Sequence, residues 1–122
     1  MCSSDLGPNR PTALFCSNDL LAMVVMRGLR RARLQIPTDM SILGFDGLAM
    51  GELLQPPLAS ICAPNREIGC AAWRRLLARI DGTYTDASLA LTLPHTLREG
   101  ATIAAISNTS EAPRVRSMQP LV

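Results

Sequence analysis

The chain has 122 residues and a mass of 13.1 kDa, enough for one domain or one half of a larger fold but too little for two complete domains. Hydrophobic residues make up 48% of the chain, so it can bury a core, yet no apolar run approaches the roughly 20 residues that span a bilayer. The formal net charge is only +2, which gives no electrostatic case for nucleic-acid binding by this chain itself.

The residues that usually carry catalysis or bind metals are scattered. None of the four cysteines forms a Cys-x-x-Cys pair, so we predict reduced thiols among apolar residues and no zinc site. The single histidine, His95, has no serine or cysteine nucleophile beside it in a recognisable motif. A glycine-rich dinucleotide or phosphate loop is also missing from the sequence. We therefore predict a protein that is not an enzyme and uses no cofactor or metal.

The two ends differ in composition from the middle. Residues 1–10 lack the basic and apolar regions of a signal peptide, and we interpret them as a non-native or linker-like start. Residues 106–122 show no periodicity and are expected to be a disordered tail. The folded unit is therefore predicted to span residues 11–105.

A strand, a helix and a second strand are predicted first. Residues 12–16 form a short apolar run that ends in Ser-Asn-Asp, typical of a buried strand leading into a helix cap. The helix over residues 20–33 carries one apolar face at helical spacing, formed by Leu21, Val24, Gly28, Leu29 and Ala32. Because other faces are apolar too, we expect it to pack on a sheet and also against something else. Residues 41–45 are the second strand, parallel to the first by default.

The second half repeats this alternation. Residues 58–62 are predicted to be a strand and residues 65–80 a helix, in which Ile68, Ala72, Leu76 and Ile80 recur at every fourth position. Short strands at 89–93 and 96–98 would complete the sheet. The predicted fold class is α/β, with a parallel sheet flanked by helices in three αβα layers.

Three polar residues follow the first two strands. Asn18 and Asp19 come after the first strand and Asp46 after the second, and ligands of open parallel sheets bind beyond these carboxyl ends. Carboxylate and amide groups together suit a neutral ligand rich in hydroxyl or N–H groups, such as a sugar, nucleoside or purine. The alternative is that Asn18 or Asp19 only caps a helix and that Asp46 only belongs to a turn.

The segments in this order resemble the C-terminal part of the effector-binding domain of the LacI/GalR family of bacterial transcription regulators. The resemblance is carried by RPTALFCSNDLLAM at 10–23, GLRRARLQIPTDMSILGFD at 28–46, ELLQPPLASI at 52–61, and EIG and LLARIDG within 67–82. It implies a periplasmic-binding-protein-like type I fold, of which this chain would be the C-terminal subdomain. It also implies that Asn18, Asp19 and Asp46 line an effector cleft and that no catalysis occurs.

The resemblance further implies the partners and the compartment. The whole protein would be a cytoplasmic homodimer that binds operator DNA through an N-terminal helix-turn-helix absent here, with the first helix and residues 48–57 in the dimer interface. One departure is Gly47, which stands where many members carry a second acidic residue. The alternatives are a sugar-binding protein of an ABC transporter, which shares the fold, and an α/β enzyme fragment.

Overall fold

The computed structural model describes residues 10–84 and 90–105, so the predicted start at 1–9 and the predicted tail at 106–122 lie outside the described residues. The elements are β1 (Ala13–Phe15), α1 (Asp19–Arg31), β2 (Ser41–Phe45), a 3-10 helix η2 (Ala49–Leu53), β3 (Ala59–Cys62), α2 (Asn65–Ile80) and β4 (Thr96–Arg98). They form one four-stranded sheet in the order β1-β2-β3-β4. The predicted α/β class is confirmed, although residues 90–93 of the strand predicted at 89–93 form no strand and Leu89 lies outside the described residues.

The sheet is parallel except at one edge. β1 and β3 both pair with β2 in parallel, which confirms the predicted strand-helix-strand unit, whereas β4 runs antiparallel to β3. In the ladder, Gly44 of β2 lies beside Ser60 of β3, and Ser60 lies beside Arg98 of β4. Since side chains alternate across a strand, Ser60 and Arg98 project from the same face of the sheet.

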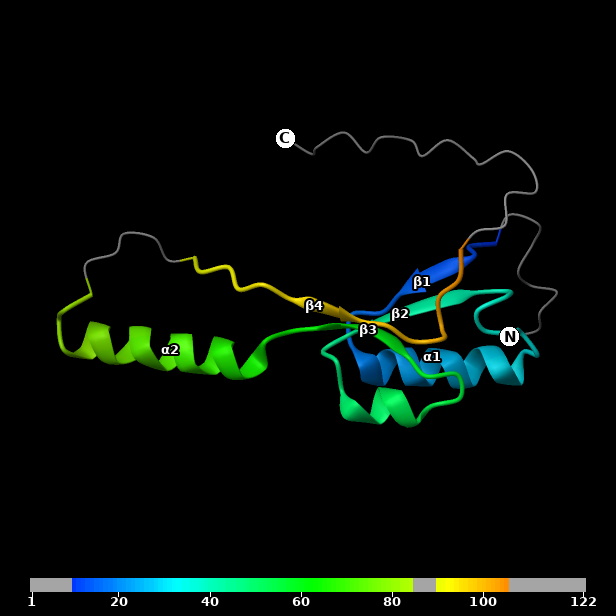
Figure 1. The fold of residues 1–122 in the computed structure, drawn as a ribbon, viewed down its shortest axis with the longest axis horizontal. Coiled ribbons are helices and arrows are strands. Elements are labelled where there is room, and N and C mark those ends of the chain that lie inside the picture. The colour runs from blue at the N-terminus through cyan, green and yellow to red at the C-terminus, as the bar shows by residue number, and fades with distance from the viewer. Residues whose placement is uncertain (1–9, 85–89, 106–122) are drawn as a thin grey trace, which may run out of the picture.

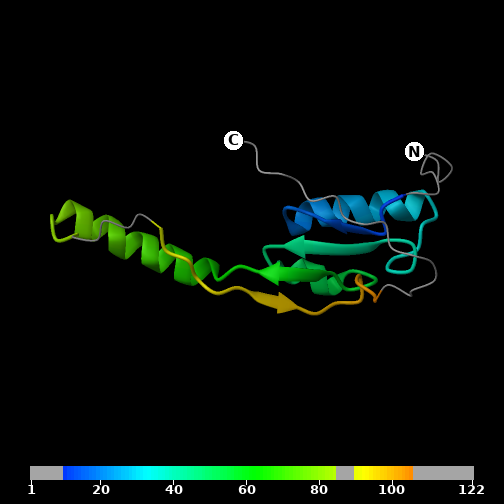
Figure 2. The same ribbon diagram turned by 90° about the horizontal axis from the view of Figure 1, so that it is seen from above.

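That face is covered by α1 and η2, which both lie beneath the strands in Figure 1, whereas Figure 2 shows α1 near β1 and η2 near β3. The core between these elements is built from Cys16, Ala22, Met26, Met40, Ile42 and Leu58. Within α1 the buried positions are Asp19, Ala22 and Met26, so these residues face the sheet. Leu21 and Val24, from the apolar face predicted for this helix, are instead 45% and 66% exposed. The helix therefore has apolar residues on more than one side, as the sequence indicated, but the predicted face around Leu21 and Val24 is turned away from the sheet.

The second helix takes no part in this core. α2 projects away from the sheet in Figures 1 and 2, and none of its residues is buried. Its exposed apolar residues include Ile68, Trp73, Leu76, Leu77 and Ile80. The opposite face of the sheet from α1 is also uncovered by the described residues, which form two of the three predicted layers. Both uncovered surfaces expose large apolar side chains, which proteins normally bury in contact with another surface.

Candidate functional site

Asn18 begins α1. Its backbone is extended, and its side-chain Oδ1 accepts a hydrogen bond from the Leu21 N–H at 2.7 Å. This is an N-cap, which satisfies one of the free amide groups of the first helical turn. The side chain stays partly accessible and its amide NH₂ group is not used by the cap. Asn18 can therefore cap the helix and still donate to a bound molecule.

Asp19 is fully enclosed. Its side chain is 0% exposed, and its carboxylate accepts from the Ser60 hydroxyl and from the Leu48 N–H, each at 2.6 Å. A buried carboxylate is tolerated only with such partners, because an unpaired one is strongly disfavoured. The prediction that Asp19 itself touches an effector does not fit this placement. The carboxylate is instead occupied by the Ser60 hydroxyl and the Leu48 N–H.

Asp46 and Gly47 form a strained turn at the carboxyl end of β2. Asp46 has φ of 103° and Gly47 has φ of 72°, and a non-glycine residue in this region costs about 1–3 kcal/mol. The Asp46 N–H donates to the Ile61 carbonyl at 2.9 Å, and the side chain is partly accessible. Among residues 10–84 and 90–105, no group hydrogen-bonds to the Asp46 carboxylate. The carboxylate is therefore free to accept from a ligand.

The structure joins Asp19 to this turn. The Leu48 N–H that follows the turn binds Asp19, while the Gly47 N–H donates to the Ser60 hydroxyl at 3.1 Å. Because β1 and β2 are parallel neighbours, Asn18 and Asp46 lie at the same edge of the sheet. In Figure 2, α2 lies beyond the carboxyl ends of β2 and β3, which is the side of this edge.

Arg98 is a member of this cluster that the sequence did not reveal. Its guanidinium Nη1 donates to the Gly47 carbonyl at 3.1 Å and to Glu52 at 3.3 Å, and Nη2 lies 3.8 Å from the Asp19 carboxylate. The only signal was an arginine within a short strand pattern. Knowing that it faces Asp19 required the register that places it beside Ser60.

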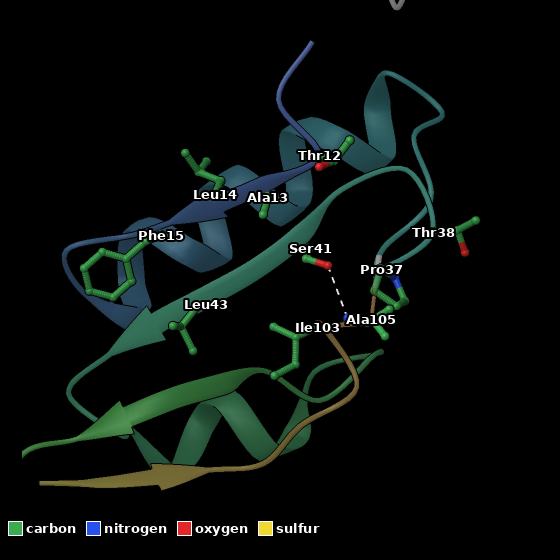
Figure 3. Close-up of a pocket in the computed structure, with 11 residues that line it drawn as sticks. Thr12, Ala13, Leu14, Phe15, Pro37, Thr38, Ser41, Leu43, Ile103 and Ala105 are labelled. Atoms are coloured by element: carbon green, nitrogen blue, oxygen red, sulfur yellow. Dashed lines mark hydrogen bonds between the residues drawn. The ribbon is translucent and has the colours of Figure 1, made fainter. Parts of the chain in front are cut away.

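A large apolar hollow lies elsewhere. It has a volume of about 680 Å³ on the face of the sheet that α1 leaves open, and it includes none of the three predicted site residues. Figure 3 shows Phe15, Leu43 and Ile103 around it, with the Ser41 hydroxyl accepting from the Ala104 N–H at 3.2 Å. We regard this hollow as an unfilled packing surface because few polar groups converge on it to orient a ligand.

The cysteines and His95 play no part in the cluster around Asp19. Cys16 is buried, which raises the pKa of its thiol, while Cys62 is half-buried and Cys70 is exposed. All three are free thiols, but the expectation of apolar surroundings is wrong for Cys70. His95 is exposed just before β4. Within 10–84 and 90–105, no group of three metal-ligating side chains could hold an ion, and no helix in those ranges is long and apolar enough to cross a membrane.

Comparison with known proteins places this geometry in a family. The model of the periplasmic binding protein-like domain matches residues 2–103. The chain is 43% identical over 78 residues to the HTH-type transcriptional repressor PurR of Vibrio vulnificus, covering 64% of this chain and 23% of that protein. Among solved structures, the regulator CelR in complex with cellobiose superposes with a TM-score of 0.72 at 28% identity, covering 80% of this chain and 29% of CelR. The lac repressor dimer bound to operator and the anti-inducer ONPF gives 0.70 at 29% identity, with 78% and 32% covered.

The chain therefore belongs to the periplasmic-binding-protein-like domain family, with the α/β fold that the sheet displays. Within it, the chain corresponds to part of the ligand-binding domain of LacI/GalR-type transcription regulators. PurR, CelR and the lac repressor are all regulators, which supports this assignment over the transporter alternative. The chain spans about a quarter of PurR and about a third of the lac repressor chain.

Proposed function

We propose that this chain is the effector-sensing part of a cytoplasmic LacI-type repressor and that it has no catalytic activity. Asp19 belongs to the same site but holds the backbone next to Asp46 through hydrogen bonds, while Asn18 and Asp46 contact a neutral effector with several hydroxyl or N–H groups. Operator DNA is bound by a helix-turn-helix outside residues 1–122. The observation that carries the proposal is the Asp46 carboxylate, held in a strained turn at the sheet edge without a partner among the described residues.

The uncovered surfaces support a larger sensor domain. The open sheet face and the apolar residues of α2 stay largely exposed among the described residues, and the relatives extend well beyond the matched segment. We propose that the remainder of the domain covers both surfaces. Asn18 and Asp46 then lie at the edge of a cleft whose other wall belongs to the part of the domain that contains α2.

A homodimer follows from the surface turned away from the sheet. Val24 of α1 and Met50 and Leu53 of η2 are 66%, 59% and 82% exposed, and both elements lie on the same face of the sheet. Exposed apolar residues grouped in this way mark protein–protein interfaces. We propose that they pair with the same residues of a second copy, as the predicted contact region of residues 48–57 requires.

The test is calorimetry of the full-length protein that contains this chain, with a panel of lactose, cellobiose, ribose, adenosine and guanine. Asp46→Asn keeps the shape of the side chain and removes its charge, so we expect the affinity for the panel member that binds to fall by about 10- to 100-fold. Asp81→Asn, at the far end of α2, is the matched control and should leave the affinity unchanged. Binding that is equally tight in Asp46→Asn would refute the site, and turnover of a panel member would refute the absence of catalysis.

A further inference from the structure

We propose that Asp19 and Arg98 are positioning residues of the effector site, acting as a buried ion pair that holds the Asp46–Gly47 turn in its ligand-binding conformation. This inference rests on the proposed function for the identity of the site. It concerns two residues that lie 79 positions apart in the chain, and it assigns to Asp19 a role other than ligand contact.

The turn needs external support. Asp46 adopts φ of 103°, a conformation that side-chain-bearing residues rarely occupy. Such a residue stays in place only when its surroundings fix it by several independent contacts. If those contacts weaken, Asp46 relaxes to a commoner conformation and its carboxylate points elsewhere.

Asp19 supplies the contacts on the donor side of the turn. Its Oδ2 accepts from the Leu48 N–H at 2.6 Å, and its Oδ1 accepts from the Ser60 hydroxyl, also at 2.6 Å. The Ser60 oxygen in turn accepts from the Gly47 N–H at 3.1 Å. One carboxylate therefore fixes two successive amide groups directly after Asp46, and hydrogen bonds to an ionised group are stronger than neutral ones.

Arg98 supplies the acceptor side and the compensating charge. Its Nη1 donates to the Gly47 carbonyl at 3.1 Å, so the peptide unit after Gly47 is held through both its carbonyl and, via Asp19, its N–H. Its Nη2 lies 3.8 Å from the Asp19 Oδ2, and its side chain is only 18% exposed. Glu52, the other carboxylate near Arg98, is 62% exposed and therefore a weak partner. Asp19 is thus the buried carboxylate beside Arg98, near enough for charge balance although no hydrogen bond joins it to Nη2.

The geometry of Gly44 shows how closely the pair is fitted. A Cβ atom added to Gly44 would collide with the Asp19 carboxylate and would lie 3.1 Å from a methyl group of Leu58. The carboxylate therefore occupies space that only a glycine at position 44 leaves open. A buried ion pair gives little net stability compared with apolar residues of the same volume, but breaking it from one side leaves an unpaired charge. That asymmetry makes the pair testable.

The experiment compares Arg98→Met, Asp19→Asn and the double variant in the full-length protein. Arg31→Met is the matched control, because Arg31 is an exposed arginine at the end of α1. Affinity for the panel is measured by calorimetry, and amide hydrogen exchange is followed at Gly47, Leu48 and Met26. We expect Arg98→Met to weaken binding at least about tenfold and to speed exchange at Gly47 and Leu48 by a similar factor. Exchange at Met26, in the middle of α1, should not change. The double variant should bind more tightly than Arg98→Met, because no unpaired charge remains.

Each result decides something. If Arg98→Met binds as well as Arg31→Met, or if the two substitutions weaken binding additively, the positioning role is refuted. If Met26 exchanges faster by the same factor as Gly47, the pair stabilises the whole fold and the inference is also refuted. If no panel member binds the unaltered protein, the proposed function fails, while the exchange rates at Gly47 and Leu48 still decide whether the pair holds the turn. Arg98→Lys keeps the charge and covers the case in which Arg98→Met does not fold. In this variant the Gly47 and Leu48 amides should exchange faster than in the unaltered protein but more slowly than expected for Arg98→Met.

Discussion

Replacing Gly47 by alanine should destabilise the protein strongly. The added Cβ atom would lie 2.8 Å from the Cys62 Cβ and 3.0 Å from the Cys62 Cα, and it would also meet the Cys62 sulfur. Two of these three atoms are fixed by the backbone of β3, so the clash cannot be relieved by a side-chain rotation. Overpacking of this kind costs about 1–3 kcal/mol. The φ of 72° adds about 1–2 kcal/mol for any residue with a side chain.

The expected loss is therefore about 2–5 kcal/mol in the free energy of unfolding, measured by urea denaturation of the full-length protein. Gly28→Ala is the matched control, because a Cβ atom at Gly28 meets nothing within 4 Å and the residue lies inside α1. That variant should gain about 0.5–1 kcal/mol through helix propensity. A Gly47→Ala protein within about 0.5 kcal/mol of the unaltered one would show that the turn is not held against Cys62 as described, a threshold set by ordinary surface substitutions.

Two further substitutions test other parts of the fold. Thr102 is fully buried, and its hydroxyl donates to the Ile42 carbonyl at 2.7 Å and accepts from the Ala59 N–H at 2.9 Å. Thr102→Val should therefore lower the free energy of unfolding by about 2–4 kcal/mol, and a loss no larger than that of the exposed Thr38→Val would contradict this. The Gln35 N–H, followed by the Arg10 side chain, lowers the pKa of Asp39. Asp39 therefore contributes fully to the free energy of unfolding at pH values above its pKa in the unfolded chain, which is about 3.9. This contribution is lost as the pH falls through the lower pKa that Asp39 has in the folded protein. When the urea midpoint of unfolding is plotted against pH, Asp39→Asn should reduce the fall of the midpoint in this acidic range. An unchanged plot would refute the stabilising role of Asp39.

The order of elements was predictable because each one has a local signal. The apolar run at 41–45 predicted β2, and apolar residues at every fourth position predicted a helix at 65–80. The structure confirms both pairs of bounds. No helix was predicted where η2 lies, because residues 49–53 carry no periodic apolar pattern. The packing partners of the elements were less predictable, as α2 shows. The structure contains its apolar face, but the spacing of apolar residues does not indicate which surface covers that face.

The site shows where local reasoning ends. Asn18 and Asp46 could be proposed because both directly follow strands that proved to be parallel. Asp19 was interpreted with them because it is adjacent in the chain, yet its position depends on Ser60, 41 residues away, and on Arg98. Burial of Asp19 also sets which side of α1 faces the sheet. The spacing of residues within one helix could not reveal partners supplied by two other strands.

The route of the chain through α2 constrains how this part of the molecule can move. The chain leaves the sheet after β3 and returns as β4, and these two strands are hydrogen-bonded neighbours, as Figures 1 and 2 show. These two adjacent connections act as two tethers: they allow the part of the molecule that contains α2 to bend relative to the sheet, but they resist its rotation about either connection alone. The second tether leads directly to Arg98, two residues beyond the start of β4. Ser60 lies equally close to the first tether, two residues before the end of β3, so a bend at this edge would reach both side chains that hold the Asp46–Gly47 turn.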